Sequence, residues 1–148
     1  SLLATNVIVP GAGFWIHNIQ GSNQNVRLAG SVVTNDSLQI TLAPGLQMIA
    51  YPYSSEVDVN TRGLTNGLAG AGPDEADELI IWDAPGQKYI YCYLRAHADP
   101  LYNRKWIDIS QEPNVVATNV LKPGDAFWYH RQDGSSFDWQ VERPYPKP

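Results

Sequence analysis

Hydrophobic and polar residues alternate in short runs along this chain, and most runs end at a turn-forming residue. Period-two alternation over four to eight residues is typical of a half-buried β-strand. In the middle of the chain it predicts strands at residues 38–42, 46–51, 78–82, 88–94 and 105–109. The Pro85-Gly86 step between two of these runs predicts a β-hairpin. Residues 56–68 are compatible with one short helix, weakened by Gly63 and Gly67.

The longest pattern is an internal repeat. Residues 4–22 (ATNVIVPGAGFWIHNIQGS) and 117–135 (ATNVLKPGDAFWYHRQDGS) are identical at 11 of 19 positions, at a constant offset of 113. Unrelated segments of this length would share about one residue by chance. The apolar alternation continues beyond both segments, so the duplicated unit spans 4–32 and 117–145. Each copy predicts a strand, a Pro-Gly turn, a strand including the Phe-Trp pair (14–17 in the first copy), a polar turn and a last strand.

The rest of the chain, residues 33–116, occurs only once. One complete β module therefore spans residues 37–143. Residues 1–33 form an N-terminal partial repeat that matches only the last third of this module, and residues 144–148 form a Pro-rich tail. The predicted fold class is all-β: an antiparallel β-sandwich or barrel of about ten short strands with a duplicated hairpin unit.

The partial repeat leaves three interpretations open. Both copies can lie in one closed fold as pseudo-symmetric halves. Alternatively, the N-terminal copy can dock on the sheet edge of the next subunit, as in donor-strand complementation, and a heterologous contact that does not close gives a fibre. The chain can also be a fragment of a longer tandem protein. A start at Ser1 rather than Met fits either a mature exported chain with its leader removed or such a fragment.

Several motifs within residues 38–143 resemble a known group of proteins. They are Met48-Ile-Ala-Tyr-Pro52, Ile80-Ile-Trp82, the tyrosine-rich run 89–93, Trp106, and Leu-x-Pro-Gly-x-x-Phe-Trp at 121–128. The pattern is similar to uncharacterised secreted β-repeat proteins of environmental bacteria. The out-of-phase partial repeat also resembles, in its organisation, the subunits of donor-strand, pilus-like filaments. The first resemblance implies a secreted β-repeat protein and brings no activity with it.

Composition excludes several classes of partner. The chain has 148 residues, a net charge of −5 and a sequence pI near 5.0, and its ten Lys and Arg residues are scattered. Nucleic acid is therefore not expected as a partner, because phosphate binding needs a basic patch. No apolar run approaches the roughly 20 residues that a membrane span needs.

No motif points to catalysis. The chain has no Gly-x-Ser-x-Gly, no His-Glu-x-x-His and no phosphate-binding loop, so we expect no enzyme, no cofactor and no metal. His17 and His130 are equivalent in the repeat, which favours a structural role for both. The acidic run at 74–78 matches no calcium-binding loop and is interpreted as a solvated loop.

The run 89–94 places two kinds of residue on opposite faces of one strand. Ile90, Cys92 and Leu94 share one face, so Cys92, the only cysteine, is predicted to be a buried core residue. Tyr89, Tyr91 and Tyr93 share the other face, where exposed rings would make a platform for a sugar ring or a neighbouring chain. Trp15 and Trp128 are equivalent in the repeat and are predicted to pack in the core or between sheets.

The leading functional prediction is an extracellular or cell-surface structural subunit that assembles head to tail into a filament or pilus-like fibre. Its partners are copies of itself, and the contact is made by the N-terminal partial repeat. The predicted assembly residues are Val7, Ile8, Phe14, Trp15 and Ile16. The alternative is a secreted carbohydrate-binding β-sandwich module that uses exposed Trp and Tyr side chains and has a glycan as its partner. Asn35 begins an Asn-x-Ser sequence and is a candidate glycosylation site.

Overall fold

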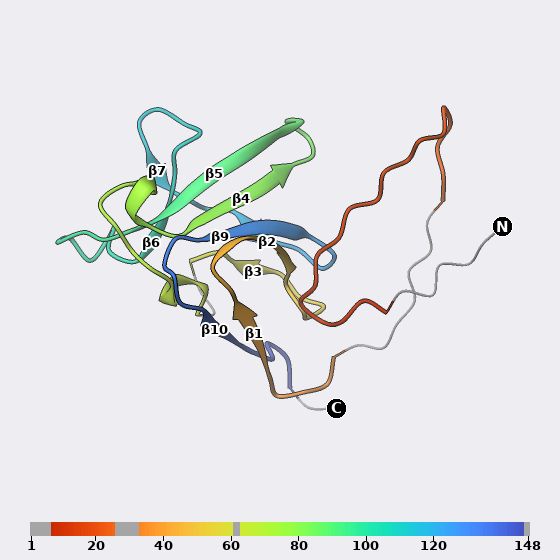
Figure 1. Cartoon of the computed structure of the whole chain (residues 1–148), viewed down its shortest axis with the longest axis horizontal. Coiled ribbons are helices and arrows are strands. Elements are labelled where there is room, and N and C mark those ends of the chain that lie inside the picture. The colour runs from red at the N-terminus through yellow and green to blue at the C-terminus, as the bar shows by residue number, and fades with distance from the viewer. Residues whose placement is uncertain (1–6, 26–32, 61–62, 147–148) are drawn as a thin grey trace.

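The structure is a computed structural model that describes residues 7–25, 33–60 and 63–146 (Figure 1). Within these ranges the chain is all-β, which confirms the predicted fold class. The ten strands there are β1 (Ser37–Leu42), β2 (Gly45–Ala50), β3 (Val57–Asp58), β4 (Glu78–Asp83), β5 (Lys88–Arg95), β6 (Lys105–Asp108), β7 (Val115–Val116), β8 (Val120–Leu121), β9 (Ala126–Arg131) and β10 (Phe137–Glu142). Two single 3₁₀ turns, η1 (Leu64–Asn66) and η2 (Pro73–Glu75), are the helical elements of the same ranges.

The strands form one large sheet and two small ones. The large sheet has six strands in the order β2-β9-β4-β5-β6-β7, while β1 pairs with β10 and β3 pairs with β8. All of these pairs are antiparallel. The strand β9 lies between β2 and β4 and forms hydrogen-bonded ladders with both. A strand from the last third of the chain is thus held by two strands from its middle.

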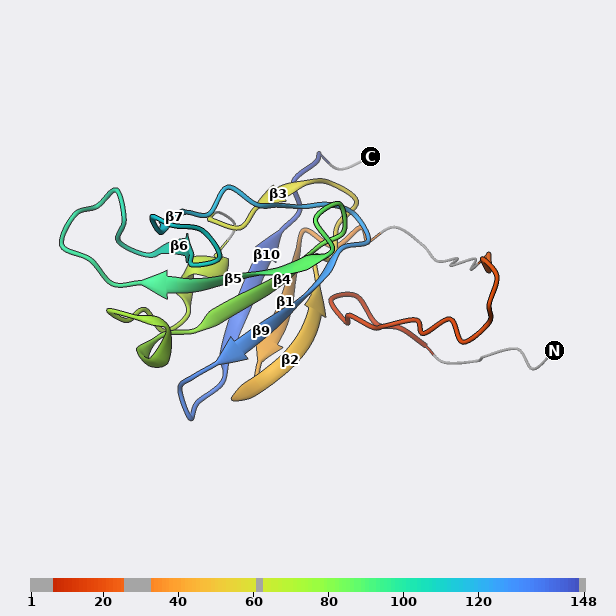
Figure 2. The ribbon, with the colours of Figure 1, turned by 90° about the horizontal axis from the view of Figure 1, so that it is seen from above.

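The sheet of β1 and β10 packs against one face of the six-stranded sheet, as in a β-sandwich, and β10 crosses behind β4 and β5 in Figure 2. Aromatic rings fill the space between the layers. The ring centroids of Phe127 and Trp139 lie 6.3 Å apart, and those of Trp106 and Tyr129 lie 6.0 Å apart with nearly perpendicular planes. Edge-to-face pairs of this kind add to the free energy of burial. We call the opposite face of the six-stranded sheet the outer face.

The five strands predicted in the middle of the chain are present with small shifts in their bounds, and the β4–β5 hairpin is present as predicted. The predicted helix at 56–68 is wrong. Its described residues form β3 and the η1 turn instead. The reason is local: Val57 and Val59 are buried two residues apart, which suits a strand, and Val59 N donates a hydrogen bond to Asn119 O.

The two copies of the repeat differ in structure. The C-terminal copy forms β8, β9 and β10, as predicted. The N-terminal copy forms no strand within residues 7–25, so the strand predicted at 14–17 is absent from this structure. The remainder of that copy, residues 4–6 and 26–32, lies outside the described residues.

Candidate functional site

Residues 11–13 tie the N-terminal copy to the edge of β2. Gly11 O accepts a hydrogen bond from Ala50 N at 2.9 Å, and Gly13 N donates one to Met48 O at 3.4 Å. A Cβ at Gly13 would lie 2.5 Å from the Met48 side chain and 3.1 Å from the Ala126 Cβ, so glycine permits this close approach. The chain therefore passes from the edge of β2 onto the outer face of the sheet. We call residues 11–13 the anchor.

The residues after the anchor, 14–25, form an arm that runs away from the module (Figures 1 and 2). Its large apolar side chains are exposed: 41% for Phe14, 57% for Trp15, 52% for Ile16 and 79% for Ile19. Val7 and Ile8, which precede the anchor, are also exposed. The five residues that the sequence singles out for assembly thus all lie at the surface. Trp15 is not a core residue, contrary to the prediction.

The arm forms no strand because the partners of its sequence are already taken. In the C-terminal copy, Phe127 pairs with Ile49 of β2 on one side and with Ile81 of β4 on the other. The equivalent Phe14 would need the same two neighbours. Since β2 and β4 belong to the segment that occurs only once, the N-terminal copy has no vacant place in its own module.

A buried carboxylate distinguishes the two copies further. Asp77 is fully buried, and its Oδ2 accepts hydrogen bonds from Tyr129 Oη at 2.6 Å, from Arg131 Nη1 at 2.8 Å and from Leu68 N at 2.9 Å. Its Oδ1 accepts one from Gln132 N at 3.0 Å. A buried charge of this kind is tolerated only when it is paired and hydrogen-bonded. Burial, followed by the hydrogen bond to Asp77, raises the pKa of Tyr129.

This network corrects one prediction and reveals a residue that sequence reasoning missed. The acidic run at 74–78 is not a wholly solvated loop: Asp74 and Glu75 are exposed, but Asp77 lies in the core. The two side chains that satisfy Asp77 are Tyr129 and Arg131, which the N-terminal copy replaces with Ile16 and Asn18. Two of the eight differences between the copies therefore fall on side chains that the buried carboxylate requires.

The outer face of the six-stranded sheet carries a row of apolar side chains. Cross-strand pairing aligns Met48 of β2, Trp128 of β9, Ile80 of β4 and Tyr91 of β5 on this face. Trp82 and Tyr89 form the next pair along the β4–β5 hairpin, with ring centroids 4.9 Å apart. These six residues define what we call the aromatic face: Met48, Ile80, Trp82, Tyr89, Tyr91 and Trp128.

Exposure on this face is uneven. Tyr91 is 44% exposed, whereas Tyr89 and Trp128 are half-buried. Trp128 therefore lies on the outer face, and the prediction that it packs in the core or between sheets is wrong. Tyr93 points to the same side of the sheet but is 5% exposed, because it packs with Ala76 and Ile107. Of the three tyrosines predicted as a platform, two therefore remain accessible.

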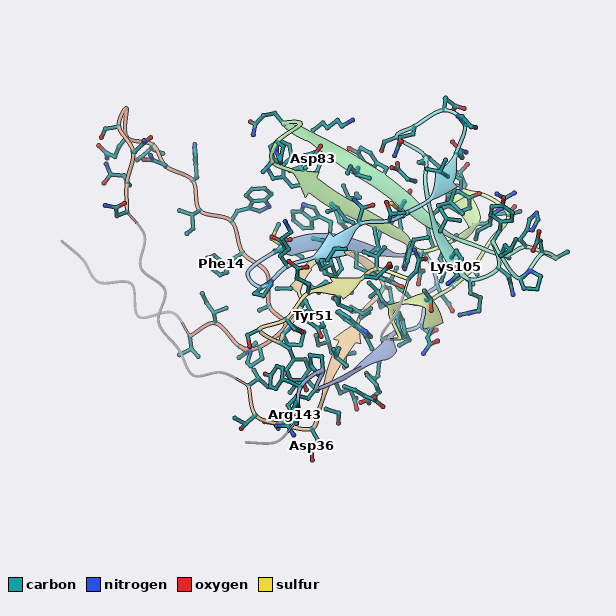
Figure 3. All side chains as sticks on the ribbon, turned by 180° about the vertical axis from the view of Figure 1, so that it is seen from behind. Phe14, Asp36, Tyr51, Asp83, Lys105 and Arg143 are labelled. Atoms are coloured by element: carbon teal, nitrogen blue, oxygen red, sulfur yellow. The ribbon has the colours of Figure 1, made fainter. Side chains whose placement is uncertain are left out.

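The base of the arm crosses the outer face between two hollows. One, of about 250 Å³, lies over the aromatic face, and Phe14 and Trp15 of the arm form part of its wall together with Trp82 and Trp128. The other, of about 550 Å³, is lined by residues 8–14 and Ile16 on one side and by Ala50, Tyr51 and Pro52 on the other. In Figure 3, Phe14 lies apart from the dense packing that surrounds Tyr51. The arm base is therefore incompletely packed on its own module.

The histidines do not come together. His130 Nδ1 lies 2.8 Å from Glu78 Oε2, both half-buried at one end of the outer face. His17 is exposed on the arm, and His97 is exposed in the loop after β5, where its Nδ1 accepts a hydrogen bond from Asp99 N. Within the described part of the chain, no group of three or more His, Cys, Asp or Glu side chains is placed to hold a metal ion.

Two further sequence predictions concern single residues. Cys92 is buried with Leu94 on the inner side of β5, as predicted, and burial raises the pKa of its thiol to about 12. Asn35 is exposed, and its backbone oxygen accepts a hydrogen bond from Tyr53 Oη at 3.1 Å. The amide side chain that a glycan would modify is thus accessible.

Comparison with protein-family models, with curated proteins and with solved structures finds no match to this chain. No helix among the described residues is long and apolar enough to cross a membrane. The fold and the surface define the class of protein: an all-β, sandwich-like module with an apolar arm anchored at one sheet edge and an aromatic outer face beside it.

Proposed function

We propose that this protein is an extracellular or cell-surface structural subunit that assembles head to tail through its N-terminal arm. The observation that carries the proposal is the exposure of Phe14, Trp15 and Ile16, whose equivalents in the C-terminal copy belong to the interior strand β9. Contiguous exposed apolar side chains on a soluble protein mark an interaction surface.

The energetics favour burial of this segment. Removing one large apolar side chain from water contributes about 1.5–3 kcal/mol, so three such side chains offer several kcal/mol towards the cost of association. The arm and the module body are different surfaces, so a contact between the arm of one copy and the body of the next is heterologous. Contacts of this type generate an open polymer unless the rotation between copies closes a ring.

The test uses the full chain with three arm substitutions: Phe14→Ser, Trp15→Ser and Ile16→Ser. We expect the wild-type chain to scatter light and to form fibres in electron micrographs, and the triple variant to remain monomeric. The control is Leu101→Ser, because Leu101 is a 72% exposed leucine in a loop remote from the arm. Fibres formed by the triple variant would overturn the proposal, and so would a wild-type chain that is monomeric at high concentration.

A further inference from the structure

If the arm of one copy binds the next copy, that copy must offer a receiving surface. The structure reduces the number of surfaces that could receive the arm. The arm could replace β9 of the neighbour, add to a sheet edge, or dock on a sheet face. The receiving surface rests on the proposed function, since it is the partner surface of the same arm.

Replacement of β9 is disfavoured by the carboxylate of Asp77. If the arm took the place of β9, Ile16 would stand where Tyr129 donates to Asp77, and Asn18 would stand where Arg131 pairs with it. The buried carboxylate would then lose its cation and a hydroxyl donor, which is strongly destabilising. The place between β2 and β4 therefore favours the C-terminal copy, which carries the partners of Asp77.

Addition to the edge of β2 is limited by the anchor. The backbone groups of Met48 and Ala50 on that edge already bond residues 11–13 of the same chain. At the other edge of the six-stranded sheet, β7 offers two residues. Neither edge offers a ladder long enough to hold a strand of the length of β9.

Among the surfaces of the six-stranded sheet the aromatic face remains, and the chain itself shows that arm residues suit it. Phe14 and Trp15 already form part of the wall of the 250 Å³ hollow beside Trp82, Tyr89 and Trp128. Aromatic side chains pack well against one another in offset or edge-to-face arrangements. The hollow is lined mostly by apolar residues, with Asp125 as its one charged residue.

The chain's own arm leaves much of this face uncovered. Strands in a sheet lie about 4.8 Å apart, so Tyr91 on β5 is about 14 Å from Met48 on β2, where the anchor bonds. Trp15 is the last arm residue that lines the hollow, and the chain then runs away from the module (Figure 2). Tyr91 stays 44% exposed as a result.

We propose that the arm of one copy docks on the aromatic face of a second copy, with Phe14, Trp15 and Ile16 packed over Ile80, Trp82 and Tyr91. The incoming side chains take the place of the second copy's own Phe14 and Trp15, whose arm docks in turn on the next copy. The second copy is the occupant because its arm carries Phe14 and Trp15, which line the hollow over this face in their own module. The same chain thus supplies both halves of the contact. Head-to-tail assembly follows because each copy has one arm and one face.

The first experiment is complementation between two full-length variants. Tyr91→Arg damages the face and leaves the arm intact, while Trp15→Arg damages the arm and leaves the face intact. We expect each variant alone to need at least about tenfold more protein than wild type to polymerise, which is the effect of losing one interface hot spot. A mixture of the two should form 1:1 dimers by analytical ultracentrifugation, because it contains one intact arm–face contact. Tyr91→Ser, which introduces no charge, repeats the test, and tryptophan fluorescence checks folding.

The second experiment locates the contact by cross-linking. Trp15→Cys in one chain and Tyr91→Cys in another should give a mixed disulfide under mild oxidation at pH 8. The native Cys92 does not compete, because it is 1% exposed and its thiol pKa is raised to about 12. Leu101→Cys replaces Tyr91→Cys in the control, and we expect no enrichment of its disulfide with position 15.

The outcomes separate the two proposals. If the Tyr91 variants polymerise like wild type while the arm variant does not, the face is the wrong receiving surface and arm-driven assembly stands. If wild-type chains stay monomeric, both proposals fail. If that monomer binds oligosaccharides and Tyr91→Ala abolishes binding, the face belongs to a sugar. A mixed disulfide between positions 15 and 91 together with 1:1 dimers supports the proposal.

Discussion

The chain contains two copies of one repeat, identical at 11 of 19 positions, in two environments, and the Pro-Gly turn of each copy has the same geometry. Gly11 and Gly124 have φ values of 87° and 90°, and each turn is closed by one backbone hydrogen bond: Ala12 N to Val9 O at 3.1 Å and Asp125 N to Lys122 O at 2.9 Å. Pro fixes the preceding φ and glycine accepts the positive φ, so this piece folds from local information alone.

The copies separate immediately after that turn. The C-terminal copy continues into β9, where Phe127 and Tyr129 are buried. The N-terminal copy continues into the arm, where Phe14 and Ile16 are exposed. The comparison teaches that this Phe-Trp segment becomes a strand only when β2 and β4 are available as neighbours, because a strand needs partners that its own sequence does not contain.

The largest expected effect comes from giving the C-terminal copy a residue of the N-terminal copy. Arg131→Asn removes the cation that pairs with the buried Asp77 at 2.8 Å, and we expect it to cost about 3–5 kcal/mol of unfolding free energy. The measurement is urea denaturation followed by tryptophan fluorescence, with the midpoint shifted and the slope unchanged.

The reciprocal change, Asn18→Arg, is the matched control. Asn18 is exposed on the arm and makes local hydrogen bonds with Gln20 N and Ser22 O, so we expect a change within about 0.5 kcal/mol. Equal losses in the two variants would mean that the copies occupy equivalent places, as in a closed pseudo-symmetric fold.

Most strands of the module were predictable because hydrophobic and polar residues alternate within each of them. The runs at 78–82 and 88–94 and the Pro-Gly step between them became the β4–β5 hairpin, and the opposite faces of β5 followed from the spacing of Cys92 and Tyr91. The strand predicted at 14–17 failed for a different reason. Its pattern is as good as that of β9, but pairing depends on residues far away in sequence, which periodicity does not report.

Asp77 was missed because it sits in an acidic run that reads as a solvated loop. Its burial depends on Tyr129 and Arg131, which are 52 and 54 residues away. A partial signal was present in the repeat itself: the copies agree at Phe and Trp, and two of their eight differences are at these positions, as Ile16 and Asn18. These two differences remove the side chains that pair with Asp77.

A smaller loss of unfolding free energy is expected from substitutions in the Pro-Gly turn, which has the same geometry in both copies. Gly124→Ala places a Cβ at φ +90°, a strain of about 1–2 kcal/mol, and no atom lies within 4 Å of that Cβ to add a clash. Because the turn leads into β9, we expect the whole module to lose this stability. The change is measured as the shift of the urea midpoint.

Gly11→Ala imposes the same strain at φ +87° and brings the Cβ to 2.7 Å from Ile40 Cδ1. Global stability should nevertheless change by less than about 0.5 kcal/mol, since the arm can detach without unfolding the module. Limited proteolysis should instead cut near the anchor faster than in wild type. A global loss as large as that of Gly124→Ala would show that the anchor belongs to the cooperative core.

Cys92 is a reporter of the module, because it is buried in the core. Its thiol pKa is raised by burial from 9.0 to about 12, so the folded state holds the proton more tightly than the unfolded state does. The stability linked to this group is fully present below pH 9 and is lost as the pH rises towards 12. We expect the unfolding free energy of Cys92→Ala to fall less steeply with pH between 9 and 12 than that of wild type.

In wild type at pH 8 a thiol reagent should label Cys92 only when the module opens. Proteolytic removal of the arm should leave the labelling rate unchanged. Faster labelling after removal of the arm would mean that the arm protects the core, and the two regions would then be less independent than their contacts indicate.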